Sequence, residues 1–326
     1  MNTGFRAVWV PERRSTGVQR MNIATACLEC FERMAQREAQ LALPHSAAGR
    51  RRVVEAWSAR LAGLDLRVPP PVIFRHLVDT VAEVVVELGG QPFDHYAEGK
   101  RRDNEAALRL LPALAARVDA EASRPGGDPL ATALELAIIG NYIDRGVDLD
   151  IDWEAELNAV GQSVDPDILA RFRAETVPGA RVVVLGDNAG EIALDTLLVR
   201  QLLARGCDVT YTVRSRPVIN DATLEDAAQV GMTELCRVVE SGVDTPGTVL
   251  DRCSPQFLQR MRDADVILSK GQGNFEALHG AMDGVYCAFK VKCDRVADET
   301  GLRLGSSAFI RLEGANRRRT AGCARS

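Results

Sequence analysis

Two carboxylates and an amide follow predicted strand ends and could together bind a divalent cation. Asp187 and Asn188 follow the apolar run 182–185 after Gly186, and Asp221 closes the loop that follows a second predicted strand, 207–213. Carboxylate and amide oxygens are the ligands that hard divalent cations prefer. Asp187 or Asn188 could equally cap the helix that begins after them, and this stretch alone does not decide between the two interpretations.

A lysine followed by a glycine-rich turn adds a candidate anion site. Lys270 follows the predicted strand 265–269. It is one of the few lysines, at 100, 270, 290 and 292, in a chain whose positive charge is almost all arginine. Glycines let backbone N–H groups approach an anion at the start of a short helix, and the lysine adds charge. We therefore expect a phosphate to bind beside the cation, in contact with the following residues: Lys270, Gly271, Gly273 and Asn274.

Three further polar residues could complete the site. Glu191 lies in the first turn of the predicted helix, where it could position water or simply favour the helix N-terminus. Arg214 begins the loop that ends at Asp221, and we expect it to contact substrate. Asn141 follows an apolar run and could be a helix C-cap or face a site shared by two lobes. The sequence leaves open whether Asp187 would act as a nucleophile or only as a ligand.

The elements that must position these residues alternate between strands and helices. The run 182–185 is apolar without polar alternation, as in a strand buried on both faces of a parallel sheet, and helical spacing follows from residue 191. The pattern predicts an α/β fold with a Rossmann-like, doubly wound, mostly parallel sheet. Because ligands bind at the carboxyl ends of such strands, side chains distant in sequence should converge there. Further strands are predicted at 207–213, 235–240, 265–269, 284–290 and 308–312.

The part of the chain before about residue 178 has helical periodicity and no convincing strand. We predict an all-helical lobe over residues 1–178, with a loose leader at 1–20, and a metal- and phosphate-binding α/β domain over 179–326 with a frayed tail at 316–326. Helices are predicted at 22–41, 53–62, 73–88, 92–118 and 130–142.

Cys27 and Cys30 lie one helical step apart near the start of the chain. No second Cys-x-x-Cys and no histidine pair exists to complete four zinc ligands. The spacing therefore favours packed thiols over a metal or redox pair.

Composition limits the function classes. The hydrophobic share of 46% and the charged share of 26% are ordinary for a globular protein, and the net charge of -5 gives no reason to expect nucleic-acid binding. No secretory apolar region and no run of membrane-spanning length is apparent, so we expect a cytoplasmic protein with no membrane partner. The oligomeric state is left open.

Several blocks of the chain resemble the damage-control phosphatases, a family of metal-dependent enzymes. The resemblance covers about residues 21–315, and the helical blocks resemble the prokaryotic branch, which has a Cys-x-x-Cys near its start. The combination is far more specific than any single block. The blocks read CLECFERMAQ, IIGNYIDRGV, GDNAGEIALD, RPVINDATLEDA, LSKGQGNFEAL and FKVKCDRVADETG.

The resemblance implies a function and roles for particular residues. Asp187, Asn188 and Asp221 match the family's metal ligands, and Lys270 matches its phosphate-contacting lysine. Members pair a helical lobe with a Rossmann-like domain and dephosphorylate small phosphorylated metabolites, often sugar phosphates, with Mn, Co, Ni or Mg. We therefore expect a metal-dependent phosphomonoester hydrolase in which Asp187, Glu191 and Lys270 are catalytic.

Two other functions are weighed against this expectation. An S-adenosylmethionine-dependent carboxyl methyltransferase also opens with a strand, a turn and a helix, but the turn here is poor in glycine and that reaction has no need of Asp221 and Lys270. A non-catalytic protein that binds a metal or a phosphorylated metabolite is the second alternative, and it would keep its metal in a closed site.

Overall fold

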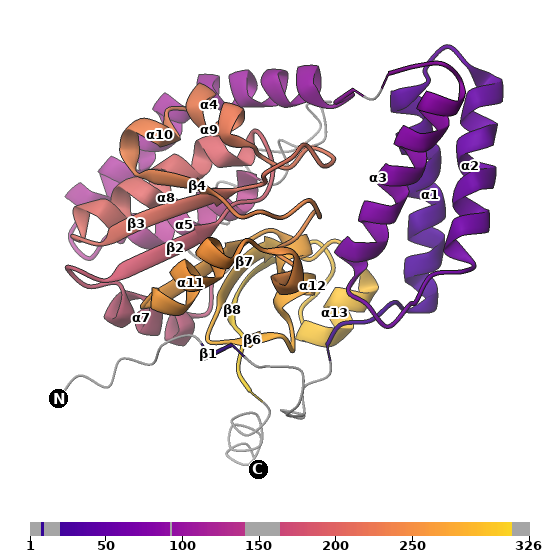
Figure 1. The fold of residues 1–326 in the computed structure, drawn as a ribbon. Coiled ribbons are helices and arrows are strands. Elements are labelled where there is room, and N and C mark those ends of the chain that lie inside the picture. Colours follow the sequence, from indigo (N-terminus) through magenta and orange to yellow (C-terminus); the bar gives the residue numbers. More distant parts are fainter. Residues whose placement is uncertain (1–7, 10–19, 92, 141–163, 315–326) are drawn as a thin grey trace.

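A six-stranded sheet forms the centre of the computed structural model, which describes residues 8–9, 20–91, 93–140 and 164–314 (Figure 1). The strand order is β4-β3-β2-β5-β7-β8, and each neighbouring pair is parallel except β7 and β8. This arrangement confirms the predicted mostly parallel α/β class. The strands are β2 (Arg181–Leu185), β3 (Asp208–Val213), β4 (Arg237–Glu240), β5 (Val266–Lys270), β7 (Tyr286–Lys290) and β8 (Ser307–Arg311).

The order of the strands reverses between β2 and β5. From β2 the chain proceeds outward through β3 to β4, and it then returns to pair β5 with the other side of β2, where Leu185 lies opposite Ser269. This reversal is the topological switch point of a doubly wound sheet, at which ligands bind beyond the carboxyl ends of the strands. The residues that follow β2 and β5 are therefore neighbours in space.

Helices cover both faces of the sheet, because its strands are apolar on both sides. Val182 and Val184 of β2 belong to one hydrophobic cluster together with residues of α4 (Ala97–Ser123), α5 (Pro129–Ile139), α7 (Pro166–Glu175) and α8 (Glu191–Ala204). Val183 and Leu185 belong to the cluster on the opposite face. That face is covered by α11 (Pro255–Asp263), α12 (Gln272–Leu278) and α13 (Asp294–Thr300), and short elements complete the domain: α9 (Leu224–Gln229), α10 (Met232–Leu235) and the 3-10 helix η2 (Leu250–Arg252).

Three helices form a separate bundle beside the sheet (Figure 1). They are α1 (Thr25–Ala42), α2 (Ala47–Leu61) and α3 (Pro70–Glu87), and they share a core of their own around Phe31 and Trp57. Ser46 caps α2 and starts it earlier than predicted, and Pro70 begins α3 because the first turn of a helix needs no N–H donor from proline.

The hydrophobic clusters group α4, α5 and α7 with the sheet and leave α1 to α3 apart. A domain boundary near residue 178 stays a prediction. The expectation of no strand before that residue is wrong, because β1 (Val8–Trp9), inside the predicted leader, pairs antiparallel with β6 (Met282–Asp283). Asn141 and the predicted tail 316–326 lie outside the described residues.

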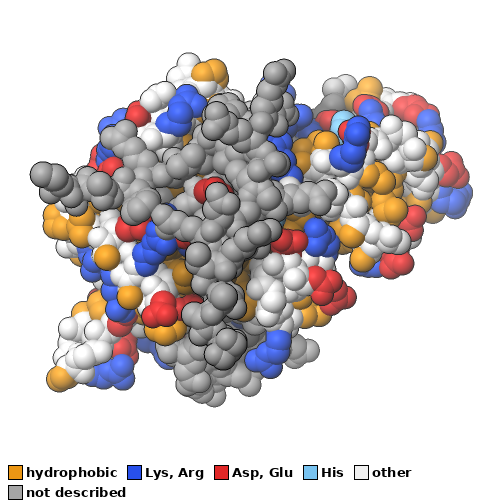
Figure 2. Space-filling model, turned by 90° about the horizontal axis from the view of Figure 1, so that it is seen from below, with side chains coloured by type: hydrophobic (Ala, Val, Ile, Leu, Met, Phe, Trp, Pro, Cys, Tyr) orange, Lys and Arg blue, Asp and Glu red, His pale blue; other side chains and the backbone are white. Residues whose placement is uncertain are grey.

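The described surface carries mixed charge. Outside the grey residues, basic and acidic side chains are interspersed on the face seen in Figure 2. Within the ranges that the structure describes, no helix is both long and apolar enough to span a membrane.

Candidate active site

The turn after β2 places Asp187 at the switch point of the sheet. A Cβ atom on Gly271, at the end of β5, would lie 1.9 Å from Oδ2 of Asp187. Gly271 also has a φ of +78°, which L side chains rarely adopt. Glycine is therefore required there to make room for the Asp187 carboxylate, in addition to any contact with an anion.

Backbone contacts join the loops after β2 and β3 and bring the three predicted metal ligands together. Asn188 and Asp221 form an isolated antiparallel bridge, and the N–H of Ala222 donates to the Asp187 carbonyl at 2.7 Å. Asp187, Asn188 and Asp221 are only 7%, 6% and 2% exposed. The geometry supports one shared site, while their role as ligands stays a prediction.

Burial and neighbouring charges shift the pKa values of the carboxylates in this site. Burial, with help from Glu191 and Asp221, raises the pKa of Asp187 well above its ordinary value. Burial likewise raises the pKa of Asp221, although Arg214, whose Nε lies 2.5 Å from Oδ2 of Asp221, opposes the shift. Nδ2 of Asn188 donates to Asp187 at 2.9 Å, which leaves the acceptor oxygen of the amide for another partner.

Lys270 lies beneath these residues in a buried ion cluster. Its Nζ donates to Glu191 and Asp195 at 2.6 Å each and to the carbonyl of Ala137 at 3.0 Å. The side chain is 0% exposed, and an ammonium has three hydrogens to donate. All three are thus engaged within the protein, so direct contact with phosphate stays a prediction that would require the cluster to open.

Asp195 is the member of this cluster that sequence reasoning missed. Its other oxygen accepts a hydrogen bond from Tyr211 at 2.7 Å, and burial raises its pKa to about 6 against the opposing charge of Lys270. The sequence did contain a signal, because Asp195 follows Glu191 by four residues and residues four apart share one face of a helix. The two carboxylates in turn hold the pKa of Lys270 above its ordinary value, although burial alone would lower it.

Four carboxylates and two cations meet in this buried region. The carboxylates belong to Asp187, Glu191, Asp195 and Asp221, and the cations to Lys270 and Arg214. With every carboxylate ionised, the four carboxylates exceed the two buried cations by two charges, and a divalent cation would balance that excess. Over the described ranges, no group of three or more His, Cys, Asp or Glu residues is arranged to hold a metal. The proposed ligand set, with two carboxylates and an amide, is of a different kind, so its chemistry fits without being demonstrated.

Arg214 and Asn274 clamp the loops below the site. Arg214 donates to Thr248 at 3.2 Å and to Asn274 at 3.1 Å, in addition to Asp221. Nδ2 of Asn274 donates to the carbonyls of Gly186 and Lys270 at 3.0 and 2.7 Å. The predicted contacts of both residues with substrate remain predictions, and their observed bonds fix the positions of the strand ends.

Two further residues approach the site from elsewhere in the chain. Oδ1 of Asn104, in α4, accepts the N–H of Gly190 at 2.6 Å, and no local sequence signal distinguishes this asparagine. Lys292, after β7, has an exposed side chain, and its backbone N–H donates to Oε1 of Gln272 at 2.8 Å, beside the start of α12. The charge of Lys292 lowers the pKa of Asp187, in opposition to the larger effect of burial.

Close packing requires glycine at position 273, because a Cβ atom there would lie 2.1 Å from the carbonyl oxygen of Pro246.

Comparison with known proteins bears on the identity of this site. The family model described as the damage-control phosphatase ARMT1-like domain matches residues 23–308. The chain belongs to this family. A damage-control phosphatase of Archaeoglobus fulgidus is 32% identical over 235 residues, which cover 71% of this chain and 80% of that protein.

Relatives of the family also share the fold. A damage-control phosphatase of Pyrococcus horikoshii is 28% identical over 297 residues, covering 89% of this chain and 98% of that protein. The crystal structure of a DUF89 family protein from the same organism superposes with a TM-score of 0.75 at 27% identity, covering 90% of this chain and 100% of that chain. The resemblance seen in the sequence blocks is thereby confirmed.

Cys27 and Cys30 are both half-buried free thiols in α1. Cys27 packs against the core of the three-helix bundle, and burial raises the pKa of Cys30. Their interpretation as packing residues stays a prediction.

Proposed function

We propose that this protein is a metal-dependent phosphatase that hydrolyses small phosphorylated metabolites such as sugar phosphates. The observation that carries the proposal is the meeting of the loops after β2, β3 and β5 at the switch point, where four buried carboxylates face two buried cations. Membership of the damage-control phosphatase family supports the same reaction class. A cytoplasmic location belongs to this proposal as well.

A divalent cation (Mn, Co, Ni or Mg) would be held by Asp187, Asn188 and Asp221. When bound, such an ion would polarise a phosphoryl oxygen and lower the pKa of a bound water. Arg214 holds Asp221 in place through the contact between Nε and Oδ2 at 2.5 Å, and its charge favours the ionised carboxylate in opposition to burial. Glu191, the first residue of α8, lies 3.5 Å from Nδ2 of Asn188 and is our candidate for positioning the attacking water.

We assign different roles to the two lysines near the site, Lys270 and Lys292. Lys270 is fully engaged with Glu191 and Asp195, and these contacts hold the first turns of α8 in place. Lys292 is an exposed residue, and its backbone N–H donates to the side chain of Gln272, the first residue of α12. We therefore assign to Lys292, together with the first N–H groups of α12, the contact with the phosphoryl group that the sequence alone assigned to Lys270.

Release of inorganic phosphate after chelation and metal replacement tests this function. We expect EDTA to abolish hydrolysis of a panel of sugar phosphates and Mn or Co to restore it, because the proposed mechanism needs a cation to polarise the phosphoryl oxygen and lower the pKa of the attacking water. Asp187→Asn should abolish both phosphate release and Mn binding measured by calorimetry. Asp208→Asn is the matched control, because this exposed aspartate lies at the opposite, amino end of β3. Undiminished turnover in thoroughly chelated, metal-free protein would contradict the proposal.

A further inference from the structure

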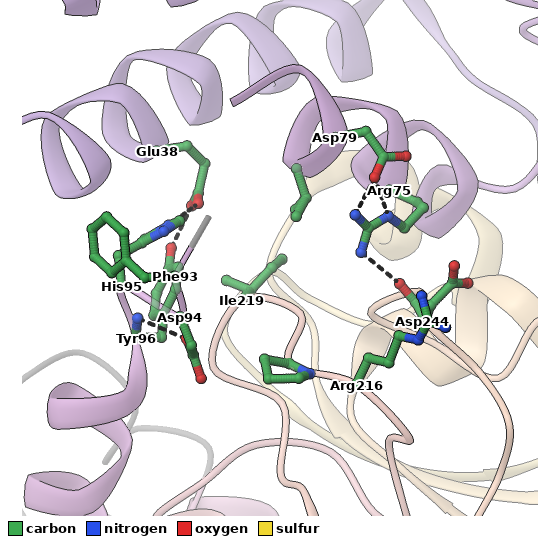
Figure 3. Close-up of a pocket in the computed structure, with 12 residues that line it drawn as sticks. Glu38, Arg75, Asp79, Phe93, Asp94, His95, Tyr96, Arg216, Ile219 and Asp244 are labelled. Carbon is green, nitrogen blue, oxygen red and sulfur yellow. Dashed lines mark hydrogen bonds and ion pairs between the residues drawn. The ribbon is translucent and has the colours of Figure 1, made fainter. Parts of the chain in front are cut away.

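A cavity of about 390 Å³ lies between the three-helix bundle and the loops after β3 and β4 (Figure 3). Small-molecule pockets commonly begin at about 300 Å³, so the space suits a small metabolite. Figure 3 shows Glu38 and His95 on one side, Arg75 and Asp244 on the other, and Ile219 between them.

The cavity shares both of its loops with the candidate active site. Ile219 lines the cavity and precedes Asp221 by two residues, so their Cα atoms are at most about 7 Å apart. Asp244 lines it from the loop whose Thr248 is bonded to Arg214 and Asn274. The cavity therefore adjoins the backbone that holds the proposed metal ligands.

Ile219 is held in an unusual conformation in this loop. Its φ of 48° lies in the left-handed region, and no other non-glycine residue among those described has a positive φ. A β-branched residue in this region is strained, and such strain is found where a loop must have one shape for function. This strained residue lines the cavity two residues before the proposed metal ligand Asp221.

The carboxylates that line the cavity are all paired. Glu38 accepts from Tyr96 and lies 3.0 Å from Nε2 of His95, and Asp244 is bonded to Arg252 at 2.6 Å. Asp79 is paired with Arg75, and Asp94 lies 3.5 Å from Lys100.

Arg216 stands apart from this pattern. Its side chain is exposed, lines the cavity and makes no hydrogen bond or ion pair with any residue that the structure describes. The cavity thus offers one guanidinium without a described partner beside the apolar side chains of Val78, Phe93 and Pro217. A guanidinium with free donors can bind a carboxylate or a phosphate through two parallel hydrogen bonds.

We propose that this cavity receives the part of the substrate distal to the transferred phosphate, and that Arg216 selects metabolites that carry a second anionic group. That group is a carboxylate or a second phosphate, and the carbon skeleton lies against the apolar wall. The inference rests on the proposed function and specifies the substrate class of the same site. Arg216 is a specificity-determining residue in this assignment. Asp187, Asn188 and Asp221 would hold the cation in the same way for every substrate.

Matched substrate pairs test the role of Arg216. The wild-type, Mn-loaded protein and its Arg216→Gln variant are assayed with glucose 1-phosphate against glucose 1,6-bisphosphate, and with glycerol 3-phosphate against 3-phosphoglycerate. We expect Arg216→Gln to lower kcat/KM for the doubly anionic member of each pair by about 10- to 100-fold, mainly by raising KM. Loss of a hydrogen bond to a charged group weakens binding by about this factor. The singly phosphorylated member should change by less than about 2-fold.

Arg237→Gln is the matched control. This exposed arginine, at the amino end of β4, also has no described partner, and its removal changes net charge equally without touching the cavity. A loss confined to the bisphosphate or to the phosphoglycerate supports the proposal and identifies the second group as phosphate or carboxylate. Equal losses for both members of each pair, or none, would overturn the assignment of Arg216 while leaving the phosphatase activity intact. Failure of the wild type to hydrolyse any of the four compounds would instead refute the proposed function, and the substrate pocket with it.

Discussion

Replacement of Lys270 by methionine tests whether the buried ion cluster is a structural anchor. Methionine keeps much of the side-chain length but leaves the Glu191 and Asp195 carboxylates buried without their shared ammonium. Removal of one partner from a buried ion pair costs about 3–5 kcal/mol. The two charge-assisted bonds at 2.6 Å point to the same range, since each is worth about 1.5–3 kcal/mol. We therefore expect the free energy of unfolding to fall by about 3–5 kcal/mol at pH 8.

The loss should depend on pH with a definite sign. Burial raises the pKa of Asp195 from 3.8 to about 6, and Lys270 opposes that rise, so its removal moves the pKa higher still. A carboxyl group whose pKa is higher in the folded state stabilises the fold fully below its unfolded pKa, and this contribution is lost as pH rises through the folded pKa. Lys270→Met should therefore be least destabilising near pH 4 and most destabilising above pH 7.

Urea denaturation at pH 5 and pH 8 measures both effects. Lys292→Met is the matched control, because it removes an exposed ammonium and should leave stability almost unchanged. Addition of Asp195→Asn and Glu191→Gln to Lys270→Met should restore much of the stability by removing the unpaired charges. If Lys270→Met kept wild-type stability at pH 8 while kcat collapsed, the anchor hypothesis would be refuted, and direct contact with the phosphoryl group would be favoured.

Two backbone predictions follow. Gly271→Ala should lower the free energy of unfolding by about 1–3 kcal/mol and weaken Mn binding, because its Cβ atom would displace the Asp187 carboxylate. Gly301→Ala is the control, because Gly301 has a φ of +71° but nothing within 4 Å, so this variant measures only the cost of placing alanine at a positive φ. Equal effects of the two substitutions on Mn affinity would contradict the argument. Ile219→Gly should be more stable than Ile219→Ala by about 1 kcal/mol in urea denaturation, because both remove the side chain but only glycine adopts a positive φ without strain. An alanine variant as stable as the glycine variant would show that the strain is absent.

The sequence by itself determined the local elements around the site. The apolar run before Asp187, the polar turn and the helical spacing after Glu191 specify strand, turn and helix, and this unit is β2 followed by α8. Because parallel strands present their carboxyl ends at one edge, residues after different strands could be placed together before any contact was seen. That reasoning brought Asp187, Asn188 and Asp221 to one place, and the bridge between Asn188 and Asp221 agrees with it.

Only the tertiary structure decided which charges pair. A lysine at a strand end can point toward a ligand or into the protein, and periodicity carries no information on that choice. The structure directs Lys270 inward, because Glu191, Asp195 and the Ala137 carbonyl, 133 residues away in sequence, offer three acceptors below the sheet edge. The contact from Asn104 to Gly190 spans 86 residues in the same way.

The cavity likewise exists only in three dimensions. Its walls come from α1, α3, the segment after residue 92 and two loops of the sheet, so no single stretch of sequence marks it. Arg216 is one of many arginines in the sequence, and its distinction appears only when the charged residues around it are seen to be paired with one another. Local patterns specify where strands end because hydrophobic periodicity is a local property, whereas the partner of a buried charge depends on packing between distant segments.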